Sequence, residues 1–169
     1  DGNITFRYFE TEVPDGDVAV KITLTGLNGG HSGLNINLQR ANANKIIFRF
    51  LKDAVSNYEA RLAAIDGGNM RNAIPREAVA VVTVPAEGVE DLMDLVHDYE
   101  ALFLTEYAGV EKTLSFTAEQ VELPSGLIPE EVQDDLINAI TACPNGMMRY
   151  IQDMPDVVET SNNLSIVKS

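Results

Sequence analysis

The chain has 169 residues, of which 45% are hydrophobic, so it is large enough to fold as one domain around its own core. Twelve lysines and arginines against 26 aspartates and glutamates give a formal net charge of −14, which argues against a nucleic-acid or anionic membrane surface. Neither a membrane-spanning run nor a leader pattern is found, so we expect a cytosolic protein. Cys143 is the only cysteine, which excludes an internal disulfide and a cysteine-based metal cage.

The N-terminal residues predict a β-hairpin. Residues 4–13 alternate loosely between apolar and polar side chains, PDGD at 14–17 is typical of a turn, and residues 18–25 alternate strictly. The chain enters directly into the first of these runs and stops in another strand-like run. We therefore expect residues 1–169 to be a single domain cut from a longer protein.

The rest of the chain alternates helical and strand patterns. Helical stripes are expected over residues 38–58 and 89–103, and strands over 60–65, 79–84 and 113–121. From residue 18 onward this gives the order strand, helix, strand, strand, helix, strand. Such an order predicts an α/β (α+β) domain with a ferredoxin-like βαββαβ antiparallel sheet and its helices on one face. This domain would be extended by the N-terminal hairpin strand, by a third helix after Pro129 and by a last strand over 164–167.

His31 is the first candidate for chemistry. It is one of two histidines in the chain and lies in the segment TGLNGGHSGLNINL, between a strand and a helix. Gly29, Gly30 and Gly33 allow backbone conformations and close approaches that other residues do not, and they place the imidazole on a loop. The plainer interpretation is that the glycines only shape the connection and that the histidine is solvated.

The second candidate is the segment GGNMRNAIP, residues 67–75. Asn69, Arg71 and Asn72 offer amide and guanidinium donors that suit a carboxylate. Asparagine and glycine also stabilise turns, so the segment taken alone is best explained as a turn between two strands. His97 has no other histidine or cysteine at ligand spacing and receives no role. The acidic side chains indicate solvated helix faces and helix starts, and no complete active site follows from the spacing of residues alone.

Three segments together resemble the aminoacyl-histidine dipeptidases, which belong to the carnosinase and aminoacylase group of two-metal peptidases. They are GLNGGHSGLNINLQRANANKIIFRFL at 26–51, GGNMRNAIPREA at 67–78 and VETSNNLSIV at 158–167. In that group a catalytic domain with two zinc ions is interrupted by an inserted lid, or dimerisation, domain. The resemblance places all of residues 1–169 in the insert, so the isolated chain should be inactive and no residue here is assigned to metal binding.

The resemblance also implies roles for individual residues. His31 matches the lid histidine that reaches the active site of the partner subunit and polarises the scissile carbonyl. Asn72 matches the asparagine that helps to hold the terminal carboxylate of the substrate, while Gly29, Gly30 and Gly33 shape the loop. Leu34, Asn35 and Ile36 depart from the expected smaller or charged residues. The implied partners are a dipeptide such as carnosine, a second copy of the chain and the chain's own catalytic domain.

Two other functions compete with this interpretation. A free-standing ferredoxin-like module could use the glycine-rich loop to bind a small anionic ligand. Alternatively, the domain could serve only for assembly, with His31 in a structural role. Metal-ligand motifs on either side of the chain would favour the peptidase.

Overall fold

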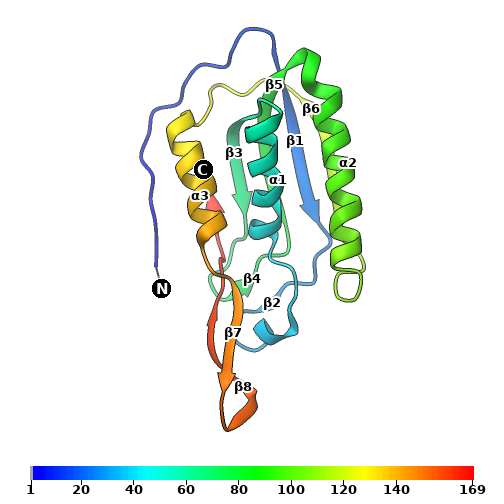
Figure 1. Ribbon diagram of the computed structural model, residues 1–169. Coiled ribbons are helices and arrows are strands. Elements are labelled where there is room, and N and C mark those ends of the chain that lie inside the picture. The colour runs from blue at the N-terminus through cyan, green and yellow to red at the C-terminus, as the bar shows by residue number, and fades with distance from the viewer. Residues whose placement is uncertain (1) are drawn as a thin grey trace.

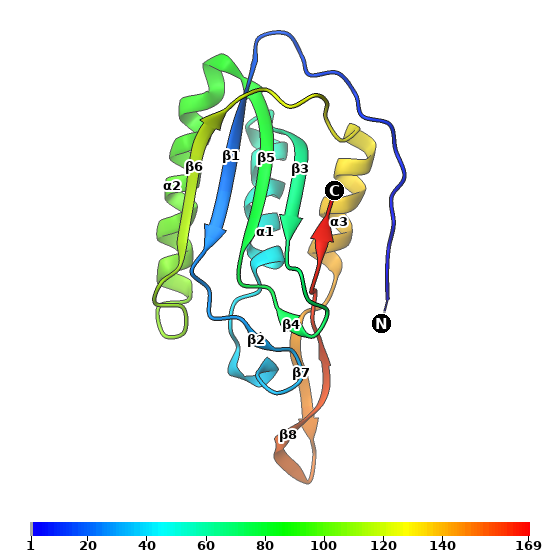
Figure 2. The ribbon, with the colours of Figure 1, turned by 180° about the vertical axis from the view of Figure 1, so that it is seen from behind.

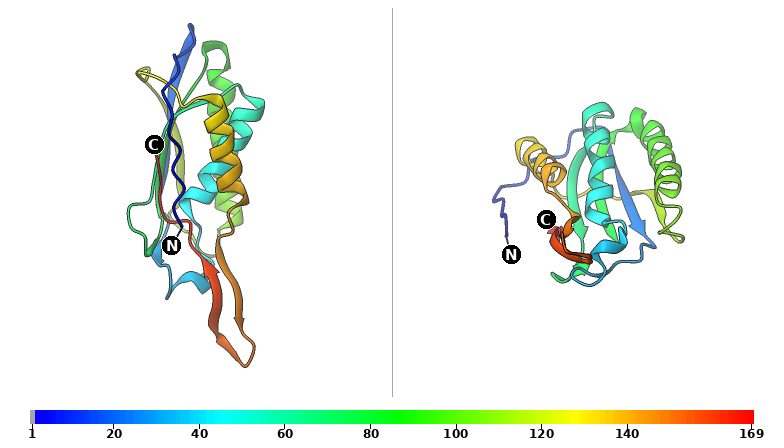
Figure 3. Two further views of the ribbon diagram at one scale, coloured as in Figure 1. Left: turned by 90° about the vertical axis from the view of Figure 1, so that its left-hand side faces the viewer. Right: turned by 60° about the horizontal axis from the view of Figure 1, so that its bottom comes forward.

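The computed structural model describes residues 2–169. Its centre is a five-stranded antiparallel sheet in the order β6-β1-β5-β3-β9. The strands are β1 (Asp17–Thr25), β3 (Arg61–Gly67), β5 (Ala78–Pro85), β6 (Ser115–Val121) and β9 (Val167–Lys168). Three helices, α1 (Ala43–Asn57), α2 (Val89–Glu106) and α3 (Glu130–Ala142), cover one face of the sheet (Figures 1 and 3).

The predicted fold class is confirmed. β1, α1, β3, β5, α2 and β6 follow the βαββαβ order, and their spatial order is that of the ferredoxin-like sheet (Figure 2). The third helix also forms, and the last strand forms with different bounds: it was expected over residues 164–167 but is β9, which begins at Val167 and pairs antiparallel with β3. No helix among residues 2–169 has the length and apolar character needed to span a membrane.

The predicted N-terminal hairpin strand is wrong. Residues 2–10 form no strand, and Thr11 makes only an isolated antiparallel bridge with Leu127. The physical reason lies in β1, which is already paired with β5 on one side and with β6 on the other. Neither edge of β1 is left for a hairpin partner, and the segment runs along the outside of the domain (Figure 1).

The core lies between the sheet and the helices. Alternate residues of β1 and β5 point into it, while α1 contributes a stripe of fully buried apolar side chains. Phe50 of α1, Phe103 of α2 and Phe116 of β6 are within 1% of complete burial, and Phe116 packs edge-on against the other two at centroid distances of 5.2 and 5.4 Å. This packing fixes both helices against the sheet.

Two small sheets occupy the end of the domain where β1 finishes. β2 (Gly30–His31) pairs with β4 (Ala73–Ile74), and β7 (Gly146–Ile151) pairs with β8 (Met154–Asn162) in a hairpin that projects from the domain (Figures 1 and 3). Short helical turns are η1 (Ile36–Leu38) and η2 (Ala86–Gly88). The connections β1–α1, β3–β5 and α2–β6 all lie at this same end.

Candidate functional site

The connection between β1 and α1 carries His31 and depends on glycine. Gly29 and Gly30 have φ angles of 63° and 133°, where other residues are strained. A Cβ on Gly30 would also lie 2.7 Å from Nη1 of Arg40 and 2.9 Å from Oδ1 of Asn35. The loop can therefore adopt this path only with glycine at these positions.

The imidazole of His31 is turned back onto its own loop. The backbone amides of Gly33 and Leu34 donate hydrogen bonds to Nδ1 over 3.0 and 3.3 Å. Because Nδ1 accepts both, a neutral ring carries its proton on Nε2. A Cβ on Gly33 would lie only 3.3 Å from Nδ1 and Cε1, so glycine there gives the ring its space. His31 is exposed and can offer Nε2–H to a group outside the loop.

Asn35 closes the turn around His31. Its side-chain Oδ1 accepts the amide of His31 over 2.9 Å, and its own amide donates to the His31 carbonyl over 2.9 Å. Ile36 next to it is 5% exposed and anchors the loop, whereas Leu34 is 78% exposed. The residues that departed from the family pattern thus form an ordered turn. In the sequence Asn35 is noted only as a departure from the family pattern, and its bond to the amide of His31 was not predicted.

The structure brings the two sequence candidates together. In the β2–β4 pair, His31 lies opposite Ala73, and the amide of Ser32 donates to the carbonyl of Asn72 over 2.9 Å. Asn72 is exposed, as is His31. The loops that carry an imidazole and a primary amide therefore share one short sheet at one end of the domain.

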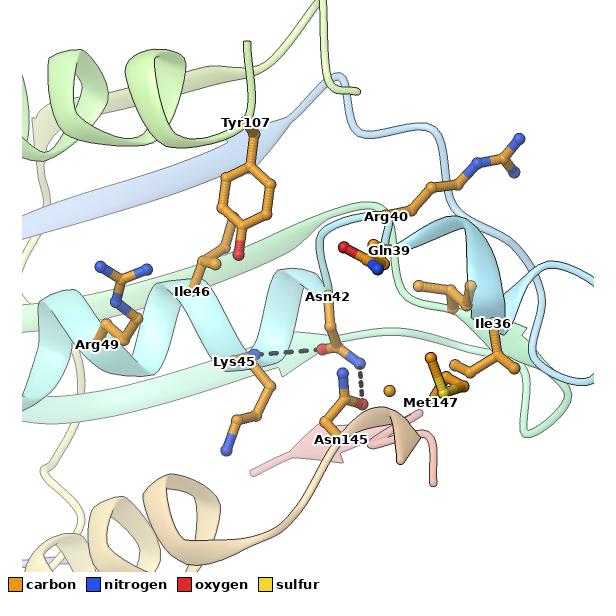
Figure 4. A pocket seen from close by; sticks show the side chains of 12 residues that line it. Ile36, Gln39, Arg40, Asn42, Lys45, Ile46, Arg49, Tyr107, Asn145 and Met147 are labelled. Atoms are coloured by element: carbon orange, nitrogen blue, oxygen red, sulfur yellow. Dashed lines mark hydrogen bonds between the residues drawn. The ribbon is translucent and has the colours of Figure 1, made fainter. Parts of the chain in front are cut away.

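Asparagine side chains tie the β4 segment to the C-terminal segment. Nδ2 of Asn163 donates to the Ala73 carbonyl over 2.8 Å. Asn42, which caps α1, donates from Nδ2 to Oδ1 of Asn145 over 2.9 Å (Figure 4). The same nitrogen donates to the Leu164 carbonyl over 3.0 Å. The third sequence motif thus supports the strand that pairs with His31.

A pocket of about 360 Å³ lies beside the loop, between α1, Tyr107 and the start of β7 (Figure 4). It contains three cations, but each already has a partner. Arg40 donates to the Gly29 carbonyl, and Lys45 donates to carbonyls at the end of α3 at distances from 2.7 to 3.1 Å. Arg49 pairs with both carboxylate oxygens of Glu106. These contacts indicate a structural use of the cations.

Two tyrosines have raised pKa values: Tyr99 on α2, and Tyr107, which lines the pocket. Burial and a 3.0 Å hydrogen bond from the Tyr99 hydroxyl to Asp53 raise the pKa of Tyr99 to about 12. Burial, followed by the charge of Glu106, raises the pKa of Tyr107. Both phenols are therefore protonated near neutral pH and act only as hydrogen-bonding groups.

Other candidate groups do not join this site. His97 is exposed on α2, and no three histidine, cysteine, aspartate or glutamate side chains within residues 2–169 gather as a metal-binding group. No chemical step in this chain is assigned to a metal.

The sheet order and the three helices define an α/β domain of the ferredoxin-like class, and comparison with known proteins specifies its family. The model of the peptidase dimerisation domain family matches residues 22–111, more than half of the chain. The chain belongs to this family.

Two relatives match nearly the whole of this chain. Cytosol non-specific dipeptidase of Escherichia coli (strain K12) is 39% identical over 155 residues, which cover 92% of this chain and 32% of that protein. The crystal structure of aminoacylhistidine dipeptidase from Vibrio alginolyticus matches with a TM-score of 0.94 and 38% identity, over 97% of this chain and 34% of that one. This chain therefore spans about a third of the length of these relatives.

A more distant match shows the fold alone. An amidase of the hydantoinase/carbamoylase family from Burkholderia multivorans has a TM-score of 0.50 and 16% identity, over 73% of this chain and 31% of that one. The sheet and helices thus recur where the sequence has diverged widely.

Proposed function

We propose that this chain is the lid and dimerisation domain of a cytosolic metallodipeptidase that hydrolyses Xaa-His dipeptides such as carnosine. One observation carries the proposal: His31 offers Nε2–H from an exposed glycine loop that is paired with the loop of Asn72. The names of the two relatives, a cytosol non-specific dipeptidase and an aminoacylhistidine dipeptidase, support it. Residues 1–169 would be inserted in a longer peptidase and be inactive alone.

In this proposal His31 stabilises the transition state. When a nucleophile attacks the scissile carbonyl, negative charge develops on its oxygen, and Nε2–H of a neutral imidazole can donate to that oxygen. The bonds from Gly33 and Leu34 fix the tautomer and the direction of the ring before the substrate arrives. Such a preorganised donor contributes about 3–4 kcal/mol in acyl-transfer sites.

Asn72 would bind the substrate throughout the reaction. Its primary amide provides two donors and can hold the terminal carboxylate of a dipeptide. Because that carboxylate carries the same charge before and during the reaction, the contact stabilises the bound substrate and the transition state alike. Gly29, Gly30 and Gly33 take part only by shaping the loop.

Two zinc ions would be bound by the catalytic domain, which lies outside this chain. Their chemistry is to polarise the scissile carbonyl and to activate water. The contribution of the present chain is confined to its own donors, His31 and Asn72, and to the closure that brings them to the substrate.

We propose that the homodimer forms along the side of β6 and α2. β6 is an edge strand that pairs only with β1 among the described residues, so it has unpaired backbone groups to offer a second copy. Leu102 and Leu104 of neighbouring α2 are 46% and 40% exposed. His31 would then act on the catalytic domain of the partner subunit.

The experiment that tests the function is an assay of the full-length protein with zinc or manganese on carnosine and other dipeptides. Hydrolysis of Xaa-His dipeptides is expected, and failure to cleave any dipeptide would refute the enzyme assignment. For assembly, Leu102→Lys should shift the full-length protein towards monomer in analytical ultracentrifugation. Ile4→Lys, at an exposed position in the N-terminal segment, is the control and should leave the dimer intact.

A further inference from the structure

We propose that Glu111 is a positioning residue that holds the His31 loop in its active shape. Glu111 lies in the connection between α2 and β6, where nothing in the sequence motifs points to it. The part of the proposal that concerns catalysis rests on the function proposed for His31, whereas the part that concerns loop geometry stands on the contacts of Glu111.

Glu111 joins the two ends of the loop. It is 1% exposed, and its Oε2 accepts the backbone amide of Asn28 over 2.7 Å while its Oε1 accepts the backbone amide of Ala41 over 2.9 Å. Asn28 precedes the glycine turn that leads to His31, and Ala41 precedes the cap of α1. One carboxylate thus closes the loop across its base, with each oxygen engaged.

The turn that carries Glu111 is itself well fixed. The amides of Val110 and Glu111 both donate to the Tyr107 carbonyl at the end of α2, over 2.9 and 2.8 Å. The side chain of Asn28 donates to the Val110 carbonyl over 2.6 Å, and the hydroxyl of Thr113 donates to the Gly26 carbonyl over 2.7 Å. The carboxylate therefore links the loop to a rigid support.

A buried carboxylate is a costly choice at this position unless both oxygens are used. An apolar residue could fill the same volume without desolvating a charge, but it could not accept two backbone amides. Loss of the carboxylate would leave the buried amide of Ala41 unpaired, remove the partner of the Asn28 amide and release both ends of the loop. The direction of Nε2–H of His31 would then no longer be fixed.

Glu100 provides a matched control. It also holds a backbone amide with its carboxylate, since Oε2 accepts the amide of Phe116 over 2.8 Å, but this bond lies between α2 and β6 and not in the His31 loop. Glutamine keeps one oxygen, so Glu100→Gln can retain its bond to Phe116. Glu111→Gln cannot retain both of its bonds, because its amide group would face an N–H donor.

The test uses the full-length enzyme with its metals. Glu111→Gln should lower kcat by roughly 10- to 100-fold with KM nearly unchanged, as expected for a misplaced catalytic donor, while Glu100→Gln should resemble wild type. Independently of activity, ¹⁵N-histidine NMR should show that His31 loses its unprotonated, hydrogen-bonded Nδ1. The His31→Ala variant identifies the resonance.

The outcomes separate the two proposals. An unchanged imidazole spectrum in Glu111→Gln would overturn the positioning role, whatever the kinetics. A changed spectrum with normal kcat would support the positioning role and count against a catalytic role for His31. If Glu111→Gln does not fold, Glu111→Asp keeps the charge but is one methylene too short to span both amides, and the same spectral change is expected. An unchanged spectrum in Glu111→Asp would likewise overturn the proposal.

Discussion

The backbone amide of Gly33 donates to Nδ1 of His31 over 3.0 Å, and this single relationship determines which nitrogen of the ring is left to donate to another group. With Nδ1 occupied as an acceptor, the neutral ring presents Nε2–H. The imidazole therefore has one orientation and one donor before any ligand binds.

Substitution of His31 tests the catalytic role directly. In the full-length enzyme His31→Ala should lower kcat by roughly 10²- to 10³-fold, because one donor to the oxyanion is lost, while metal content and folding stay normal. His97→Ala removes the other histidine of the chain, exposed on α2, and should have little effect. Near-normal kcat in His31→Ala would mean that the loop is structural.

Gly33→Ala tests the space around the ring without removing the ring. The new Cβ would approach Nδ1 and Cε1 of His31 to 3.3 Å, so we expect the imidazole to tilt and kcat to fall, with stability changed little. Gly109→Ala is the control, since a Cβ there meets nothing within 4 Å. Steady-state kinetics and thermal unfolding of both variants check this, and equal kcat values would contradict the proposed ring position.

Asn72→Ala should act on substrate binding. Because the proposed contact to the carboxylate exists both before and during the reaction, KM should rise while kcat changes little. Asn69→Ala alters an exposed asparagine of the same turn and serves as the matched control. A large loss of kcat with unchanged KM would place Asn72 among the groups that act only in the transition state.

Subunit mixing tests whether His31 acts across the dimer. His31→Ala subunits combined with subunits disabled at the metal site should give heterodimers with one fully equipped active site. Activity above that of the separate variants is the expected result. If the mixed subunits are no more active than the separate variants, His31 acts within its own subunit or has no catalytic role.

The stability of the domain should depend on alkaline pH through Tyr99. Burial and the bond to Asp53 raise the pKa of Tyr99 from 10.0 to about 12, so the native state keeps this proton more tightly than the unfolded state. The stabilisation is complete below pH 10 and is lost as the pH rises towards 12. Tyr107, whose pKa is also raised, adds in the same direction.

Urea unfolding at about pH 9 and pH 11 measures this effect. The midpoint for wild type should fall more steeply between the two pH values than the midpoint for Tyr99→Phe, which keeps the packed ring but cannot ionise. Tyr107→Phe should, by itself, also reduce the fall of the urea midpoint between the two pH values. If the urea midpoint falls equally in wild type and in Tyr99→Phe, Tyr99 does not contribute to the pH dependence of stability.

Core periodicity predicted most of the fold. α1, α2 and the central strands bury regular apolar stripes, and such stripes follow from spacing alone. β7 and β8 were missed because they pair only with each other and project from the domain, so their side chains show little buried periodicity. The error at residues 4–13 arose because alternation indicates a strand but does not show whether a sheet edge is free.

The candidate site was predictable only in part. Resemblance pointed to His31 and Asn72, but their pairing through β2 and β4 was not visible, since two-residue strands carry no periodic signal. Glu111 is one of 26 acidic residues in the chain, and nothing in its neighbours distinguishes it from the solvated ones. Its importance depends on burial and on two backbone amides that are distant in sequence.

The arrangement of the connections leaves the other end of the sheet free for engineering. The His31, Asn72 and Glu111 segments gather at one end, whereas the connection from β5 to α2 turns at the opposite end through η2 (Figures 1 and 2). A Cβ on Gly88 in that turn meets nothing within 4 Å, and the chain contains no tryptophan. Gly88→Trp would therefore give the domain a single indole fluorophore that reports its folding without touching the His31, Asn72 and Glu111 segments.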